Sequence, residues 1–359
     1  MRLNKGVPLI PTLAARRRLA LAACGVAGVL LTAAACGSSG GTTTSTAATA
    51  SAGAASGLRL AQPTTIKQLS VPYFGLEHIA EAQGFWKKYN LTVDMVTSLQ
   101  GAQGVAGVVD GQVETMYANT PDTPLLAIHA GGKVKEVAAS EIDSPTYDTV
   151  RYYVLKSSGI TSAAGLAGKR VGMPATSSYY EDALLQYLKG HGVSPTKVTS
   201  VAVPATNLVG SLLSHQVSAI AVGDVFYAQL ESKYASKVSL LFRDMTAFPS
   251  ATKYLTGYIF SDSYIAAHPD VVRAYIAGLQ AAAKFVQTNP EQARKDIAAL
   301  TGQSPAGIPI PSYPSNLCIN TAAAQTLAKQ VMALGIVPAG TVTSPGQWVT
   351  NQYNPKCSS

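Results

Sequence analysis

The chain has 359 residues, of which 47% are hydrophobic and 13% are charged, and its formal net charge is +8. Five positive residues and no acidic residue precede Cys36, so the chain from Cys36 onward carries only +3. A charge this small, without a basic run, argues against a nucleic-acid partner. Roughly 300 residues follow a low-complexity segment, which is more than one core usually holds, so two domains are expected.

Residues 1–35 have the pattern of a bacterial secretory signal peptide. Arg16, Arg17 and Arg18 precede an apolar run over residues 19–35, which ends in small residues next to Cys36. A cysteine at the cleavage point, followed by a flexible segment, resembles the bacterial lipoprotein signal. The resemblance implies cleavage before Cys36, lipid on its thiol and an extracytoplasmic protein anchored to the cell membrane. Residues 36–63, rich in Ser, Thr, Gly and Ala in their first part, are then expected to form a flexible tether.

Two alternatives compete with this interpretation of the N-terminus. The apolar run over residues 19–35 could be a retained membrane helix, although it is shorter than the roughly 20 strongly apolar residues that a span requires. Cys24 fits the local lipoprotein pattern better than Cys36, where Ala33 stands in place of the preferred Leu. However, Cys24 follows Arg18 too closely to leave an apolar region of about 7–15 residues.

Strand and helix patterns alternate from Thr65 onward, which predicts an α/β fold. A first set of expected strands covers residues 66–71, 91–96, 113–117, 134–139 and 150–155, with helices over 76–85, 105–109 and 125–130. A second set of expected strands covers residues 170–173, 198–203, 217–222, 238–242 and 258–260, with helices over 178–189, 207–213 and from 229. The last third is expected to be helical, over residues 269–286, from 289 and over 321–334, with a loop over 302–314. The two sets resemble each other, which agrees with two similar lobes.

Three stretches resemble the substrate-binding proteins of ABC importers, in the nitrate, sulfonate, taurine and thiamine-pyrimidine-precursor (SsuA/THI5-like) group. They are residues 80–93 (AEAQGFWKKYNLTV), residues 165–172 (GLAGKRVG), and residues 268–270 (HPD) together with 289–293 (NPEQA). The likeness spans about residues 64–334. It implies a two-lobed, type II periplasmic-binding-protein-like fold, with mixed sheets flanked by helices and the ligand in a cleft between the lobes.

The resemblance also implies limits for the lobes, since the chain of such proteins crosses between them twice. The crossovers would fall near Lys156 and Gly257. Lobe one would comprise residues 64–156 and 256–359, with the C-terminal helices and tail, and lobe two would comprise residues 157–255.

Candidate ligand-binding residues follow from a general rule, because open α/β sheets bind ligands beyond the carboxyl ends of their strands. The likeness points to the same strand ends. The candidates are Tyr73, Phe74, Gln100, Gly101, Asn119, Thr120, Glu141, Thr176, Ser177, Ser178 and Asp224.

Several candidates also have a structural interpretation. Tyr73 and Phe74 would form an apolar wall of the site, or pack beneath the first helix, and Gly101 would admit the ligand or serve a turn. Asn119 and Thr120 are the best polar candidates. Ser178 would lie at a helix N-terminus, where free N–H groups attract anions, or would only cap the helix in a capping box with Glu181.

The charged candidates favour a particular solute. Asp224 could meet an amine or a ring nitrogen, or remain a solvated loop carboxylate, and Glu77 and Glu141 are weaker candidates of the same kind. No arginine lies in these loops, whereas an oxyanion binds best to charge-assisted donors. The sequence therefore favours a neutral, aromatic or cationic organic solute over nitrate or sulfonate.

Two cysteines remain if Cys24 leaves with the signal peptide and Cys36 carries lipid. Cys318 and Cys357 would then lie in a compartment that permits disulfides. We predict that they pair and close the C-terminal tail onto the body, the alternative being two free thiols.

The function implied by the resemblance is solute delivery. The protein would bind a small organic solute of the sulfonate, nitrate or pyrimidine-like class, close on it, and deliver it as a monomer to an ABC permease, without a cofactor and without catalysis. No phosphate-binding loop or metalloprotease motif occurs. Two alternatives stay open: an enzyme on the same fold, like the pyrimidine-precursor synthases, whose cysteine-rich motif is absent here, and a surface protein that uses the fold structurally.

Overall fold

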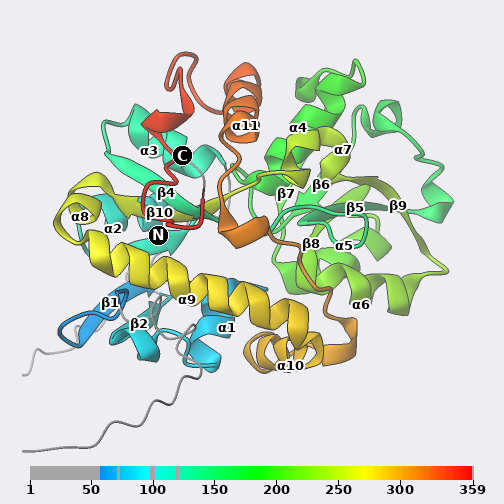
Figure 1. Cartoon of the computed structure of the whole chain (residues 1–359). Helices are drawn as coiled ribbons and strands as arrows, with labels where there is room; N and C mark the ends of the chain where they lie inside the picture. Colours follow the sequence, from blue (N-terminus) through cyan, green and yellow to red (C-terminus); the bar gives the residue numbers. More distant parts are fainter. Residues whose placement is uncertain (1–56, 71–72, 98–101, 119–120, 358–359) are drawn as a thin grey trace, which may run out of the picture. The chain divides into compact units, whose positions relative to one another are not determined.

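The computed structural model describes residues 57–70, 73–97, 102–118 and 121–357. Within these ranges the strands form two five-stranded mixed sheets, each flanked by helices (Figure 1). The described helices lack the combination of length and apolar character that a bilayer crossing needs. The expected signal peptide, Cys36 and most of the expected tether lie outside the described residues.

The first sheet has the strand order β2-β1-β3-β10-β4. β1 pairs in parallel with β2 and β3, and β10 runs antiparallel to β3 and β4. β10 is buried along its whole length, as its apolar sequence predicts for a strand covered on both faces. The strands are β1 (Thr64–Leu69), β2 (Leu91–Val96), β3 (Thr115–Tyr117), β4 (Val134–Ala139) and β10 (Gly257–Ser261).

The second sheet has the strand order β7-β6-β8-β5-β9. β6 pairs in parallel with β7 and β8, and β5 runs antiparallel to β8 and β9. The strands are β5 (Val150–Leu155), β6 (Arg170–Met173), β7 (Thr199–Ala202), β8 (Ala219–Gly223) and β9 (Val238–Arg243).

The two sheets share one topology, and this confirms the expected two-sheet α/β fold. Each consists of parallel strands plus one antiparallel strand contributed by the far part of the chain, β10 in the first sheet and β5 in the second. The chain therefore crosses between the sheets twice, through residues 140–149 and 244–256, which we call the first and second crossing segments.

The placement of β5 corrects one expectation. A crossover near Lys156 would leave residues 150–155 with the first lobe, but β5 pairs Val150 with Gly223 and Leu155 with Val238, both in the second sheet. The physical reason is that an alternating or apolar pattern identifies a strand without identifying its neighbours.

Helices cover both sheets. The α-helices are α1 (Leu76–Ala82), α2 (Ala102–Val109), α3 (Asp122–His129), α4 (Tyr179–Gly190), α5 (Leu208–Leu213), α6 (Asp224–Tyr234), α7 (Asp244–Ala247), α8 (Asp262–Ala267), α9 (Pro269–Thr288), α10 (Pro290–Thr301) and α11 (Thr321–Ala333). The 3-10 helices are η1 (Lys87–Tyr89), η2 (Lys156–Ser158), η3 (Ala163–Leu166), η4 (Pro195–Lys197), η5 (Ala205–Asn207), η6 (Pro249–Thr252), η7 (Pro305–Gly307), η8 (Ser315–Leu317) and η9 (Pro345–Gln347).

The long helix α9 is fixed to the core of the first sheet by Trp86. The indole of Trp86 stacks on Tyr275 with 5.4 Å between ring centroids and donates a hydrogen bond to the Tyr275 carbonyl over 2.9 Å. A Cβ at Gly278 would lie only 2.0 Å from the Trp86 ring, so this position in α9 must be glycine. The proline at the first position of α9, and that of α10, suits a helix start because proline has no N–H to satisfy.

The C-terminal helices are less uniform than expected. α9 and α10 pack with α1 beside the first sheet. α11 instead contacts the second crossing segment and the second half: Gln330 receives a hydrogen bond from Ser250 of η6 over 3.3 Å, and Lys189 of α4 donates to the Ala333 carbonyl over 2.8 Å. α11 therefore lies beside the second crossing segment rather than on the first lobe alone.

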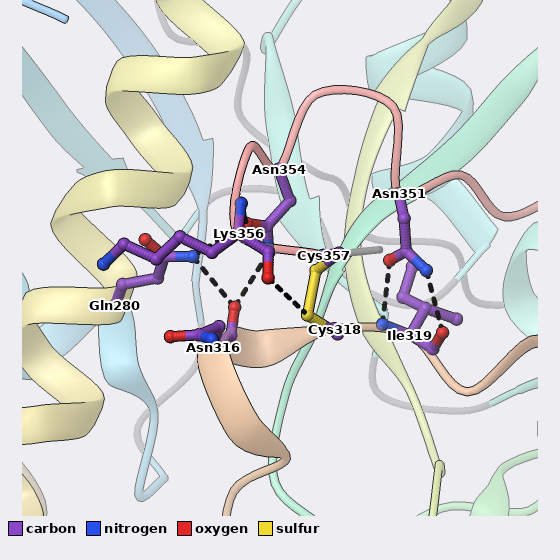
Figure 2. The surroundings of a disulfide bond; sticks show 8 residues. All are labelled: Gln280, Asn316, Cys318, Ile319, Asn351, Asn354, Lys356 and Cys357. Atoms are coloured by element: carbon purple, nitrogen blue, oxygen red, sulfur yellow. Dashed lines mark hydrogen bonds between the residues drawn. A yellow bond between two sulfur atoms is a disulfide. The ribbon is translucent and has the colours of Figure 1, made fainter. Parts of the chain in front are cut away.

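The C-terminal tail is held by a disulfide between Cys318 and Cys357, the pair predicted from the sequence (Figure 2). The Cα atoms are 5.5 Å apart, which lies inside the range that a disulfide spans. Beside it, the Asn351 amide exchanges two hydrogen bonds of 2.9 Å with the Ile319 backbone. Gln280 of α9 donates to Asn354 over 2.9 Å and so joins the tail to the first-sheet core.

Candidate functional site

The loop between β1 and α1 brings two of the predicted residues into different roles. Phe74 is fully buried in the core of the first sheet, which corresponds to packing beneath the first helix rather than to an exposed wall. Tyr73 is partly exposed, and its hydroxyl donates a hydrogen bond to Glu77 Oε1 over 2.7 Å. A Cβ at Gly75 would lie 2.6 Å from the Glu77 carboxylate, so glycine is needed for this turn to close.

Glu77 is a fully buried carboxyl group whose two oxygens are both occupied. Tyr73 donates to one oxygen, and Tyr258 of β10 donates to the other over 2.7 Å. The Tyr73 ring also stacks on Tyr117 of β3, with 4.6 Å between the centroids. Two strands of the first sheet, β3 and β10, and the loop after β1 thus contribute tyrosines to the same place.

Glu141 lies in the first crossing segment, directly after β4, and is 1% exposed. The hydroxyls of Tyr117 and Ser140 donate hydrogen bonds to its two oxygens. Burial raises the pKa of Glu141 from 4.5 to about 7, and the two hydroxyl bonds act in the opposite direction. At neutral pH this carboxyl group is therefore close to its point of protonation.

Asp224 is the first residue of α6, and not a loop residue as expected from the sequence. Tyr147 of the first crossing segment donates to its Oδ2 over 3.2 Å. Burial raises the pKa of Asp224 from 3.8 to about 6, whereas backbone hydrogen bonds from Val225 and Phe74 and the Tyr147 hydroxyl lower it. The Phe74 contact joins the strand ends of the two sheets, because Phe74 follows β1 and Asp224 follows β8.

Tyr313 completes the arrangement from a distant part of the sequence. Ile142 and Ser312 form an isolated bridge, which places the Tyr313 segment against the first crossing segment. Tyr313 is 8% exposed, and in the described part of the chain its hydroxyl has no hydrogen-bond partner. Burial raises its pKa, and the charges of Glu141, Glu77 and Asp224 raise it further. Its ring belongs to the same buried core as Phe74, Tyr117 and Tyr258.

These side chains form one buried group, which we call the tyrosine–carboxyl cluster. Its members are Glu77, Glu141, Asp224, Tyr73, Tyr117, Tyr147, Tyr258 and Tyr313. Over the described ranges, no lysine or arginine forms an ion pair with its three carboxyls. The same ranges contain no group of three His, Cys, Asp or Glu side chains placed to hold a metal ion.

Three of the predicted residues lie apart from the cluster's hydrogen bonds. Thr176 and Ser177 are exposed, and the Ser177 N–H donates to Glu181 Oε2 over 2.7 Å. The Ser178 hydroxyl donates to the Ala175 carbonyl over 2.7 Å instead of accepting from the helix. The expected capping box is therefore wrong, because the Ser178 hydroxyl bonds to the preceding loop. Glu181 also places negative charge at this helix end.

The remaining predicted residues, Gln100, Gly101, Asn119 and Thr120, lie outside the described residues.

Sequence reasoning missed four tyrosines of the cluster, at positions 117, 147, 258 and 313. One signal was available, since the chain has 17 tyrosines and only 7 phenylalanines. Such an excess of hydroxyl-bearing rings indicates aromatic positions with polar partners.

A depression of about 400 Å³ lies between α6 and the segment around η7, away from the cluster. Gln229, Lys233 and Ser304 are among its lining residues, and none of the cluster's carboxyls is. The tyrosine–carboxyl cluster is the stronger candidate site, because polar groups from both sheets converge there at the strand ends.

The comparison with protein families is decisive for this chain. The family described as NMT1/THI5 like matches residues 71–293, which is more than half of the sequence. The chain belongs to the NMT1/THI5-like family. The resemblance stated from three stretches of sequence is thereby confirmed, and residues 71–293 of this family member include the whole second sheet.

Curated relatives of this NMT1/THI5-like protein occur in Brucella. A protein of Brucella abortus (strain 2308) that carries a binding-protein name is 27% identical over 220 residues, 60% of this chain. The match spans 63% of that relative's length.

Solved structures of binding proteins share the fold. The alkanesulfonate-binding protein SsuA from Xanthomonas axonopodis pv. citri, bound to MOPS, has a TM-score of 0.64 at 19% identity, covering 81% of this chain and 100% of its own. The periplasmic nitrate-binding protein NrtA from Synechocystis PCC 6803 has a TM-score of 0.64 at 12% identity, covering 81% and 87%. At such low identity these matches show the fold of this family member and nothing finer.

An enzyme also has this fold. The desulfurization enzyme DszB has a TM-score of 0.57 at 14% identity, covering 80% of this chain and 97% of its own. The fold alone therefore does not separate binding from catalysis, and the residues at the strand ends must do so.

Proposed function

We propose that the protein is an extracytoplasmic solute-binding protein that delivers a small organic solute to an ABC permease in the membrane. In this proposal a lipid on Cys36 anchors a monomeric body. Lobe one consists of the first sheet with its helices, and lobe two of the second sheet with its helices. The two lobes are joined by the crossing segments at residues 140–149 and 244–256. The family match and the binding proteins that share the fold support this assignment.

The observation that carries the proposal is the convergence of both sheets on one cluster. Tyr117 and Tyr258 lie in strands of the first sheet, and Tyr73 follows its strand β1. Asp224 follows a strand of the second sheet, and Glu141 lies in a crossing segment. A solute bound among these groups would touch both lobes at once. It would therefore stabilise a closed arrangement in proportion to its preference for that arrangement.

The alternative enzyme function finds less support in the described residues. Cys318 and Cys357 are joined in a disulfide, so neither offers a nucleophilic thiol. His78 contacts Tyr73 edge-on and is hydrogen-bonded to Ser70 over 3.0 Å. A general base with an oriented partner is the arrangement that catalysis would need.

A thermal-shift screen with the lipid-anchored protein in detergent tests the proposed function. Small solutes of the sulfonate, nitrate, amine, pyrimidine and aromatic-acid classes are added one at a time. At least one class should raise the melting temperature in a dose-dependent way, because a ligand that binds only the folded state stabilises it. Chemical conversion of the stabilising solute, followed by mass spectrometry, would support the enzyme instead. The absence of a shift with every class would contradict solute binding.

A further inference from the structure

Every tyrosine hydroxyl of the tyrosine–carboxyl cluster except that of Tyr313 donates to one of the cluster's own carboxyls. Tyr73 and Tyr258 donate to Glu77, Tyr117 donates to Glu141, and Tyr147 donates to Asp224. Each of these hydroxyls has one hydrogen, so none is left to donate to a ligand. What the cluster can still offer is lone pairs, on the carboxylates and on the phenolic oxygens.

The three ionisable side chains of the cluster other than its tyrosines are all acidic. Glu77, Glu141 and Asp224 are 0%, 1% and 8% exposed. Arg151, which lies over the Tyr227 ring, is already paired with Asp148 at 2.5 Å and Glu231 at 2.9 Å. Buried carboxylates without a basic partner are costly unless a cation or a proton compensates them.

Tyr313 supplies an independent indication of where a ligand would bind. Its ring belongs to the same buried core as Tyr117 and Tyr258, and its hydroxyl is buried and lacks a partner among the described residues. Buried hydroxyl groups in folded proteins are almost always hydrogen-bonded. A solute with an N–H donor would satisfy the Tyr313 oxygen and neutralise the carboxyls with the same group.

We propose that the solute is a small organic cation, an ammonium or amidinium ion on a flat or aromatic body, whose N–H groups bind Glu141, Asp224 and Tyr313. The stacked rings of Tyr73 and Tyr117 provide the flat surface beside it, and the faces of such rings attract cations. This inference rests on the proposed function and narrows its solute class. An anion such as a sulfonate would meet three carboxyls and find the Tyr313 hydroxyl as its one remaining cluster donor.

A panel of solutes matched in shape and differing in charge tests the class. Benzylamine, benzamidine and agmatine are the cations, benzylsulfonate, benzoate and nitrate the anions, and benzyl alcohol the neutral member. Each is titrated into the lipid-anchored, full-length mature protein in detergent, with calorimetry and melting temperature as readouts. The cations should bind and raise the melting temperature, and the anions should not.

Three variants locate the binding. Asp224→Asn and Glu141→Gln should each weaken the best cation about tenfold or more, because hydrogen bonds to charged groups are the stronger ones. Tyr313→Phe should weaken it about threefold to tenfold. The same variant should leave the unliganded melting temperature unchanged or raised, since the lost hydroxyl has no partner among the described residues. Glu136→Gln, which alters a buried carboxyl bonded to Tyr254 outside the cluster, is the matched control and should keep full affinity.

The outcomes separate the class of solute from the proposed function. Binding of an anion or of benzyl alcohol, with no binding of the cations, would overturn the cationic class while leaving a solute-binding protein. Cation binding that survives both Asp224→Asn and Glu141→Gln would overturn the assignment of these residues. If no member of the panel binds or shifts the melting temperature, the result counts against the cationic class of solute and against solute binding together.

Discussion

The hydroxyl of Tyr147 donates a hydrogen bond to Asp224 Oδ2 over 3.2 Å. Tyr147 belongs to the first crossing segment, and Asp224 begins α6 beside the second sheet. The bond therefore joins a segment between the sheets to the carboxylate that is proposed to meet the solute. A change at Tyr147 should alter the ionisation of Asp224 as well as the packing of the segment.

Tyr147→Phe should raise the pKa of Asp224 above its present value of about 6, because the Tyr147 hydroxyl is one of the groups that lower it. More of the carboxyl is then protonated near pH 6.5, so cation affinity should fall there and recover by about pH 8.5. Carboxyl carbon chemical shifts, followed through a pH titration, measure the change directly. Tyr254→Phe, which removes a hydroxyl donor from Glu136 instead, is the control. An unchanged Asp224 titration in Tyr147→Phe would show that this bond is not formed in solution.

The stability of the unliganded protein should fall as the pH rises from about 5 to about 8. Burial raises the pKa of Glu136 from 4.5 to about 8, with the Tyr254 hydroxyl acting in the opposite direction. Between these values the folded protein holds a proton that the unfolded chain has released, so the free energy of unfolding decreases with rising pH. Glu141, with a pKa of about 7, and Asp224, with a pKa of about 6, contribute in the same sense.

Glu136→Gln should make this dependence shallower, because an amide does not titrate. Urea unfolding at pH 5, 6, 7 and 8 measures the slope, and Asp270→Asn, at an exposed carboxyl, should leave it as it is. A steeper slope in Glu136→Gln would contradict a raised pKa at this carboxyl.

Gly278→Ala should destabilise the protein by about 1–3 kcal/mol. The added methyl group would lie 2.0 Å from Trp86 Cδ1, so either the indole or α9 must move. Gly210→Ala is a matched helical control, because a Cβ there meets nothing within 4 Å. It should be neutral or stabilising by about 0.5–1 kcal/mol. Chemical denaturation of both variants compares them, and an equal effect of the two would mean that α9 does not pack on Trp86 as described.

Reduction of the Cys318–Cys357 disulfide should lower the free energy of unfolding by about 4 kcal/mol, because a bond that closes 39 residues restricts the unfolded chain. Cys318→Ser with Cys357→Ser should reproduce the effect of reductant. The melting temperature with and without reductant, together with a two-dalton mass difference in the intact protein, are the measurements. The hydrogen bonds of Asn351 and Asn354 should keep the tail docked at low temperature (Figure 2).

Cys36→Ser should release the protein from the membrane fraction, because its thiol is the proposed lipid attachment. Cys24→Ser is the matched control and should leave the protein membrane-bound. Detergent partitioning of the two variants in a bacterial host, and mass analysis of the mature N-terminus, distinguish them. Release by Cys24→Ser alone would move the cleavage site to the earlier cysteine.

The sequence predicted the positions of the strands and helices better than it predicted which strands pair with one another. The alternation of short apolar strands with helices gave the α/β class, and the described strands fall close to the expected ranges. The strand at residues 150–155 was correctly expected but given to the first lobe, whereas it pairs with Val238 and Gly223 in the second sheet. Strand pairing depends on how the chain closes over long distances, which a local pattern does not record.

The candidate site was predicted in part for a similar reason. The strand-end rule selected Tyr73, Glu141 and Asp224, which the structure brings into one cluster, since loops after strands can be read along the chain. It could not select Tyr313, which reaches the cluster because Ser312 bridges Ile142 across a long stretch of sequence. It also misjudged Ser178, whose hydroxyl has two possible partners that only the loop geometry distinguishes.

The amino-acid sequence by itself determined the signal pattern, the alternation of strands and helices, the family and the two cysteines available to pair, because these depend on residue type and local spacing. The tertiary structure alone decided which sheet receives β5 and which hydroxyls face Glu77, Glu141 and Asp224. Those contacts join residues far apart in the chain, and the burial that raises the pKa of Glu141 and of Asp224 exists only once both sheets have formed around them.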